Sequence, residues 1–135
     1  MPHLVILYSA NLDKETDMTA LCRAMADSML TLRDEEGKQV YPTGGTRVFA
    51  YPAAHYAVAD GKGDYAFCYL NVRMARGRSD AVKKNVGETL IAVAKAHFAP
   101  IFDKRPIGVT LQVDEGLEVF DAKHSSLHPL FNKAA

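Results

Sequence analysis

The sequence has no excess of either charge, only two cysteines and no long apolar run. Its 135 residues include 16 Lys and Arg and 16 Asp and Glu, so the formal net charge is zero with histidine neutral. A nucleic-acid-binding protein normally carries a basic excess, so this balance argues against nucleic acid as a partner. No stretch of about 18 apolar residues could form a transmembrane helix, and the short apolar start lacks the basic segment of a signal peptide. We therefore expect a cytoplasmic protein without membrane contacts.

Several common signatures of reactive or ligand-binding sites are also missing. Cys22 and Cys68 are far apart in the sequence and apolar in context, which favours buried reduced thiols over a disulfide or a metal site. His124 and His128 have the four-residue spacing of helical metal ligands, but no third ligand follows at a recognisable distance. Glycine-rich phosphate-binding loops and a Gly-x-Ser-x-Gly nucleophile motif are absent. The sequence therefore predicts no metal and no phosphate-binding loop.

The hydrophobic pattern predicts the element order β-α-β-β-α-β. Alternating or continuous apolar runs predict strands, and three- and four-residue apolar spacing predicts helices. Thr16 is expected to cap the first helix and Ser79 the second, while Pro100 is expected to end or kink the second helix. Pro52 indicates an edge position or a bulge in the second strand. The expected strands cover residues 4–8, 47–58, 64–74 and 107–113, and the apolar stripes of the helices cover residues 18–32 and 82–101.

This order predicts an α+β fold with both helices on one face of a four-stranded mixed sheet, in a single domain over residues 1–135. Right-handed crossovers between parallel strands place both helices on the same side of the sheet. The other face carries Tyr65, Phe67 and Tyr69, which is too much apolar surface to leave in water at about 25 cal/mol per Å². We therefore expect this face to pack against further copies of the chain.

Two groups of residues could carry chemistry. Removal of Met1 would leave Pro2 with a free secondary amine, which an apolar pocket and nearby cations would keep neutral enough to act as a general base. If Met1 is retained, the Pro2 nitrogen is an amide without basicity, and proline at position two often has no catalytic meaning. Arg47, Arg73, Arg76 and Arg78 have guanidinium groups suited to carboxylate and phosphate oxygens, although they could be ordinary solvated charges.

Five short segments are informative in their order and spacing. They are Met1-Pro2-His3-Leu4-Val5-Ile6, Asp64-Tyr65-Ala66-Phe67, Gly77-Arg78-Ser79, Ala96-His97-Phe98-Ala99 and Leu127-His128-Pro129-Leu130-Phe131. Together they resemble the 5-carboxymethyl-2-hydroxymuconate isomerase family of the tautomerase superfamily. The resemblance extends over nearly the whole chain and implies a homotrimeric, cofactor-independent isomerase that acts in the degradation of homoprotocatechuate, an aromatic compound.

The resemblance also implies a reaction and roles for three residues. The expected enzyme converts 5-carboxymethyl-2-hydroxymuconate, or a similar unsaturated 2-hydroxy polycarboxylate, to its 2-oxo isomer by keto–enol tautomerisation. Pro2 takes the position of the catalytic base, and Arg47 and Arg78 take positions that bind the small-molecule carboxylate substrate. Two alternatives stay open: a non-catalytic trimeric carboxylate-binding protein, and a related tautomerase or dehalogenase with a different substrate.

Overall fold

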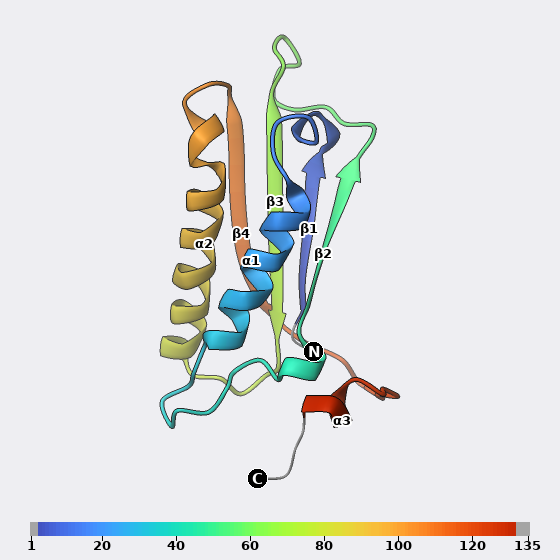
Figure 1. Cartoon of the computed structure of the whole chain (residues 1–135), viewed down its shortest axis with the longest axis vertical. Helices are drawn as coiled ribbons and strands as arrows, with labels where there is room; N and C mark the ends of the chain where they lie inside the picture. Colours follow the sequence, from blue (N-terminus) through green and yellow to red (C-terminus); the bar gives the residue numbers. More distant parts are fainter. Residues whose placement is uncertain (1–2, 132–135) are drawn as a thin grey trace.

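Four strands form one mixed sheet in the computed structural model, which describes residues 3–131 (Figure 1). The strands are β1 (His3–Ser9), β2 (Arg47–Ala53), β3 (Ala66–Met74) and β4 (Ile107–Glu115), and their order across the sheet is β2-β1-β3-β4. β1 is parallel to β2 and β3 is parallel to β4, whereas the central pair β1–β3 is antiparallel. The predicted mixed sheet is therefore confirmed.

Two long helices connect the parallel strands and lie on the same face of the sheet (Figure 1). They are α1 (Met18–Thr31) and α2 (Asp80–Phe102); the short elements are η1 (Ala10–Leu12), η2 (Thr43–Gly45) and α3 (His128–Phe131). Within the described chain, none of these helices has the length and apolar character needed to cross a membrane. The predicted β-α-β-β-α-β order is confirmed, with both helices on one side.

A single hydrophobic cluster joins the two helices to the sheet. Because side chains alternate along a strand, one face of β3 is entirely buried and the other is partly exposed. The helices contribute apolar stripes at three- and four-residue spacing, which pack onto this face. The buried cluster includes Leu4, Ile6, Leu21, Met25, Met29, Cys68, Leu70, Val72, Val86, Leu90 and Phe98.

The helix starts agree only in part with the sequence-based expectation. The Ser79 side chain accepts a hydrogen bond from the Val82 backbone N–H, so the predicted cap of α2 is confirmed. The predicted cap of α1 is wrong, because Asp17 caps that helix instead of Thr16. The Thr16 hydroxyl lies 2.7 Å from Nε2 of His97 instead. These residues are 81 positions apart, so no local sequence pattern predicts the contact.

The positions of two prolines agree with what the sequence predicted for them. Pro52 lies in β2, an edge strand, so its missing N–H does not remove a hydrogen bond between central strands. This strand ends at Ala53 and does not continue to residue 58. Pro100 lies in the last turn of α2, which ends shortly afterwards at Phe102.

Within residues 3–131, no further element covers the sheet face opposite the helices. Four large apolar side chains on it, Leu7, Phe49, Tyr51 and Phe67, are 40–52% exposed. They come from β1, β2 and β3, so the exposed area spans three adjacent strands. Contiguous exposed apolar surface of this kind is typical of interaction sites.

Candidate functional site

Three chain segments that carry the expected site residues meet at one end of the sheet. His3, the first residue of β1, pairs with Arg47 of β2 on one side and with Arg73 of β3 on the other. β1 and β2 therefore begin at this end, and β3 ends there and leads into the loop that contains Arg78 (Figure 1). Pro2, the expected base, lies outside the described residues.

Arg47 is positioned by the turn that precedes β2. Its Nη1 donates a hydrogen bond of 2.9 Å to the carbonyl oxygen of Gly45, the last residue of η2. A guanidinium has five N–H donors, so this bond leaves most of them available to a ligand. Arg47 borders two cavities. One of about 580 Å³ lies between α1 and β2, and one of about 320 Å³ lies under residues 122–131, the C-terminal segment.

Arg78 is fixed against the segment that follows α1. Its Nη2 donates to the carbonyl oxygen of Val40 at 3.1 Å, and its Nη1 lies 3.6 Å from the carboxylate of Asp34. The backbone N–H of Lys38, then that of Glu36, and the charge of Arg78 lower the pKa of the Asp34 carboxyl. Asp34 therefore stays ionised and can orient Arg78, whose side chain is still 27% exposed.

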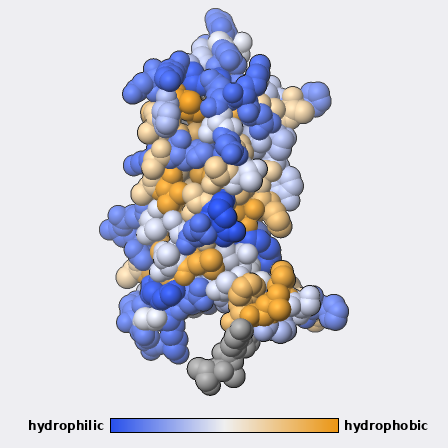
Figure 2. Space-filling view, in the orientation of Figure 1, coloured by the Kyte–Doolittle hydropathy of each residue, from blue (hydrophilic) through white to orange (hydrophobic). Residues whose placement is uncertain are grey.

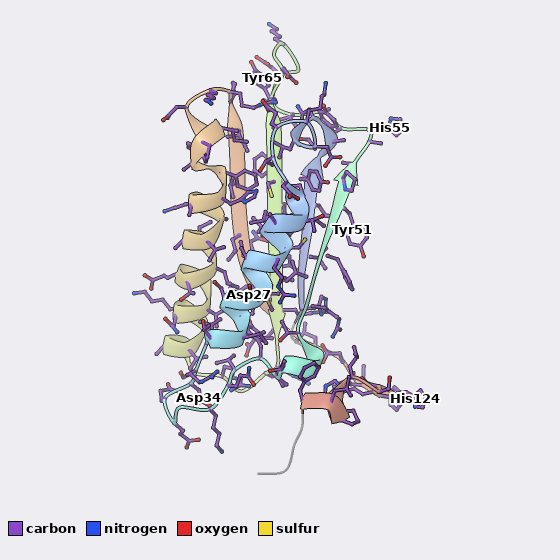
Figure 3. The ribbon with its side chains drawn as sticks, in the orientation of Figure 1. Asp27, Asp34, Tyr51, His55, Tyr65 and His124 are labelled. Atoms are coloured by element: carbon purple, nitrogen blue, oxygen red, sulfur yellow. The ribbon has the colours of Figure 1, made fainter. Side chains whose placement is uncertain are left out.

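Within one chain, the two arginines have different neighbours at this end of the molecule. Arg78 contacts Asp34, whereas the smaller cavity beside Arg47 includes His124. Figure 3 shows Asp34 and His124 at the same end of the structure but on opposite sides. The structure therefore brings both predicted arginines to the end where β1 begins, each held by its own segment.

Tyr41 is a polar side chain in this region that the sequence pattern did not indicate. The residue is fully buried, and its hydroxyl has no hydrogen-bond partner among the described residues. Burial raises the pKa of the Tyr41 hydroxyl, and the charge of Arg78 opposes this shift. A buried donor without a partner costs about 1–3 kcal/mol, so such groups are rare in folded proteins. Neither Tyr41 nor Asp34 belongs to a motif, so only the folded chain associates them with Arg78.

The thiols do not provide a nucleophile. Both cysteines are free; Cys68 is buried and Cys22 is half-buried, so the expectation of two buried thiols holds fully only for Cys68. Burial raises the pKa of the Cys68 thiol to about 12 and also raises the pKa of the Cys22 thiol. Within residues 3–131, no group of three or more His, Cys, Asp or Glu side chains is arranged to hold a metal ion.

Comparison with known proteins identifies the family whose sequence and structure this chain matches. Residues 2–131 match the model of the family described as 5-carboxymethyl-2-hydroxymuconate isomerase. A crystal structure of a 5-carboxymethyl-2-hydroxymuconate delta-isomerase is 58% identical, with a TM-score of 0.95 over 100% of this chain and 95% of that chain. A 5-carboxymethyl-2-hydroxymuconate isomerase from Deinococcus radiodurans R1 is 32% identical, with a TM-score of 0.86 over 98% of this chain and 95% of the other.

A curated relative has the same name, and a more distant structure shares the fold. The 5-carboxymethyl-2-hydroxymuconate Delta-isomerase of Escherichia coli is 25% identical over 97% of this chain and 99% of its own length. A fused 4-OT wild-type symmetric trimer is 20% identical over 93% of this chain and 96% of the other, with a TM-score of 0.58, which shows the fold alone. Since the family model covers almost the whole chain and the shared fold extends over its full length, the chain belongs to the 5-carboxymethyl-2-hydroxymuconate isomerase family.

Proposed function

We propose that this isomerase converts 5-carboxymethyl-2-hydroxymuconate, or a closely similar unsaturated 2-hydroxy polycarboxylate, to its 2-oxo isomer. Pro2 acts as the base after removal of Met1, and Arg47 and Arg78 bind the substrate carboxylates. The reaction belongs to the cytoplasmic breakdown of homoprotocatechuate. The substrate is a small carboxylate, and neither nucleic acid nor a membrane takes part.

The observation that carries this proposal is the pairing of His3 with Arg47. Pro2 is the residue before His3, and consecutive Cα atoms are about 3.8 Å apart, so covalent geometry limits how far its nitrogen can be from the start of β2. The guanidinium of Arg47 adds positive charge at the same end, which disfavours protonation of a nearby amine. The arrangement therefore supports a neutral amine beside an anion-binding arginine.

The proposed chemistry is a proton transfer without net gain or loss of atoms. The Pro2 nitrogen takes the proton of the 2-hydroxyl group, and the resulting dienolate spreads its negative charge along the conjugated chain. The prolinium then returns a proton to a carbon atom further along that chain, which leaves the 2-oxo product and the free amine. Guanidinium donors stabilise the dienolate as its charge develops.

We also propose that the enzyme works as a homotrimer assembled through the sheet face that the helices leave uncovered. Leu7, Phe49, Tyr51 and Phe67 would be buried there between copies of the chain. The trimeric state of a structure with the same fold supports this assembly. Sedimentation of the purified protein tests it, and a monomer at micromolar concentration would contradict it.

The test of the reaction combines an intact-mass measurement with kinetics. The native protein should lack the mass of one methionine, and it should ketonise the dienol substrate with a change in ultraviolet absorbance. Retention of Met1, which makes the Pro2 nitrogen an amide, should lower kcat by at least about 100-fold, since a positioned general base contributes about 10²–10⁴-fold. Pro2→Ala keeps a primary amine in place of the secondary amine and should lower kcat by a smaller factor. Arg78→Ala should mainly raise KM because it removes a charged contact to the substrate.

Two matched controls make this test specific. Pro106→Ala changes an exposed proline at the opposite end of the sheet, just before β4, and should leave the rate within twofold. Arg76→Ala removes an exposed charge two positions from Arg78, and should change KM much less than Arg78→Ala. Full activity of the Pro2→Ala variant, or of a form that retains Met1, would remove Pro2 from the mechanism.

A further inference from the structure

The C-terminal segment closes a cavity over the start of β2. Helix α3 packs on η2 so tightly that a Cβ atom on Gly44 would lie 2.8 Å from the Cα of His128. A Cβ atom on Gly45 would lie 3.3 Å from the imidazole Nε2 of His128. The cavity of about 320 Å³ lies between this turn and the segment around His124, whose position Figure 3 shows beside α3. The C-terminal segment therefore forms one wall of the cavity that Arg47 borders.

The side chains around this cavity are basic or neutral. Arg47 and Lys123 bring two full positive charges, and His124 and Ser125 bring further hydrogen-bonding groups. No aspartate or glutamate is among the described residues that line it. The Ser125 oxygen accepts the backbone N–H of Leu127 at 3.0 Å, which orders the turn and leaves the hydroxyl hydrogen available as a donor.

Lys123 is held near the cavity by one carboxylate outside it. Its ammonium forms an ion pair of 2.8 Å with Asp121, and this bond lowers the pKa of the Asp121 carboxyl. An ammonium has three donors, so the pair with Asp121 leaves Lys123 able to bind a second anion. Asp121 therefore positions the ammonium without excluding a ligand from it.

The charge on the proposed substrate exceeds what two arginines can neutralise. 5-Carboxymethyl-2-hydroxymuconate has three carboxylates, one more than the two arginines, Arg47 and Arg78, that the proposed function assigns to bind them. We propose that Arg47, Lys123 and His124 form a carboxylate subsite that takes one carboxylate of a tricarboxylate and makes the enzyme prefer it to a dicarboxylate. This inference rests on the proposed function, and it identifies Lys123 and His124 as determinants of specificity.

The kinetic test compares two substrates that differ by one carboxylate. Lys123→Met should raise KM for 5-carboxymethyl-2-hydroxymuconate roughly tenfold, because it removes one charge-assisted contact, and should leave kcat within twofold. KM for 2-hydroxymuconate, which lacks the carboxymethyl group, should change by less than twofold. Lys123→Arg should restore most of the discrimination because it keeps the charge. Lys104→Met, an exposed lysine at the opposite end of the sheet, is the matched control and should change neither KM.

A binding measurement separates failure of the subsite from failure of the proposed reaction. Tricarballylate and glutarate are unreactive probes with three and two carboxylates, and calorimetry measures both on the native protein. Selective loss of tricarballylate affinity in Lys123→Met supports the subsite even if the wild type converts neither dienol. Equal changes of KM for both substrates, or a wild type that does not bind tricarballylate more tightly than glutarate, would overturn it.

Discussion

Replacement of Gly44 by alanine should damage the site while leaving the core intact. The added Cβ would lie 2.8 Å from His128 Cα, 3.1 Å from His128 N and 3.3 Å from the carbonyl carbon of Leu127. All three atoms are backbone, so no side-chain rotation can relieve the contact. Restoring an ordinary contact of 3.4 Å requires η2 and α3 to separate by about 0.6 Å.

The expected loss of kcat/KM in Gly44→Ala follows from this displacement. A misplacement of about 1 Å at a site can cost on the order of 100-fold in rate, so about 0.6 Å predicts a loss on the order of tenfold in kcat/KM. The contact lies outside the hydrophobic cluster of the two helices and the sheet, so the thermal midpoint should stay within about 3 °C of the wild type. Tricarboxylate turnover and thermal unfolding together measure both quantities.

Gly87→Ala is the matched control for Gly44→Ala. A Cβ atom at Gly87 would lie 3.6 Å from a methyl group of Val113, which is an ordinary contact in a helix interior. Alanine is favoured over glycine there by about 1 kcal/mol, so the thermal midpoint should rise by about 3 °C with unchanged turnover. Wild-type kcat/KM in Gly44→Ala would refute the reasoning, since the C-terminal segment would then not define the site.

Three further predictions concern stability. Leu90→Ala removes a fully buried side chain from the centre of α2 and should cost about 2–5 kcal/mol in urea unfolding; a loss below 1 kcal/mol would mean that the cluster repacks. Ser79→Ala should cost about 1 kcal/mol because Val82 N–H loses its acceptor, whereas Ser79→Asn should retain most of the stability. Burial lowers the pKa of His97 below its usual 6.5, against the opposing charge of Asp17. The unfolded chain therefore binds this proton more readily than the folded chain does. The free energy of unfolding should be highest above pH 6.5 and should fall as the pH drops through the folded-state pKa of His97. His97→Gln should remove that part of the pH dependence.

Features that depend on local pattern were predictable from the sequence. The alternation along residues 66–74 defines which face of β3 is buried, and it needs no knowledge of the partners. Ser79 caps α2 because its hydroxyl and the Val82 N–H are three residues apart. The missing N–H of Pro52 predicts an edge position or a bulge, and β2 is an edge strand.

Features that depend on distant contacts were not predictable in the same way. Thr16 is a good cap by residue type, but its hydroxyl is beside His97, and Asp17 takes the cap. The pairing of Arg78 with Asp34 likewise joins residues that are 44 positions apart. The segment around Lys123 shows no periodicity, so nothing in the sequence places it beside Arg47. Side-chain chemistry made the arginines candidates and the resemblance to a family singled out Arg47 and Arg78, whereas their neighbours are known only from the folded chain.

The two halves of the described chain have the same topology and are related by an axis between the central strands, β1 and β3. β1-α1-β2 and β3-α2-β4 are both parallel units, and the first residues of their strands pair in the same way, His3 with Arg47 and Ala66 with Ile107. This internal symmetry makes Ile107 the counterpart of Arg47.

The symmetry of the backbone is not matched by its chemistry. The counterpart of Pro2 is Tyr65, whose nitrogen is part of a peptide bond and has no basicity. Arg105, a cation near that end, is paired with Glu15 and Asp64. The end where β4 begins therefore holds an ion-paired arginine, whereas the proposed base, Pro2, directly precedes β1 in the sequence. An arginine introduced at Ile107 would have no basic nitrogen beside it and should not create a second proton-transfer site.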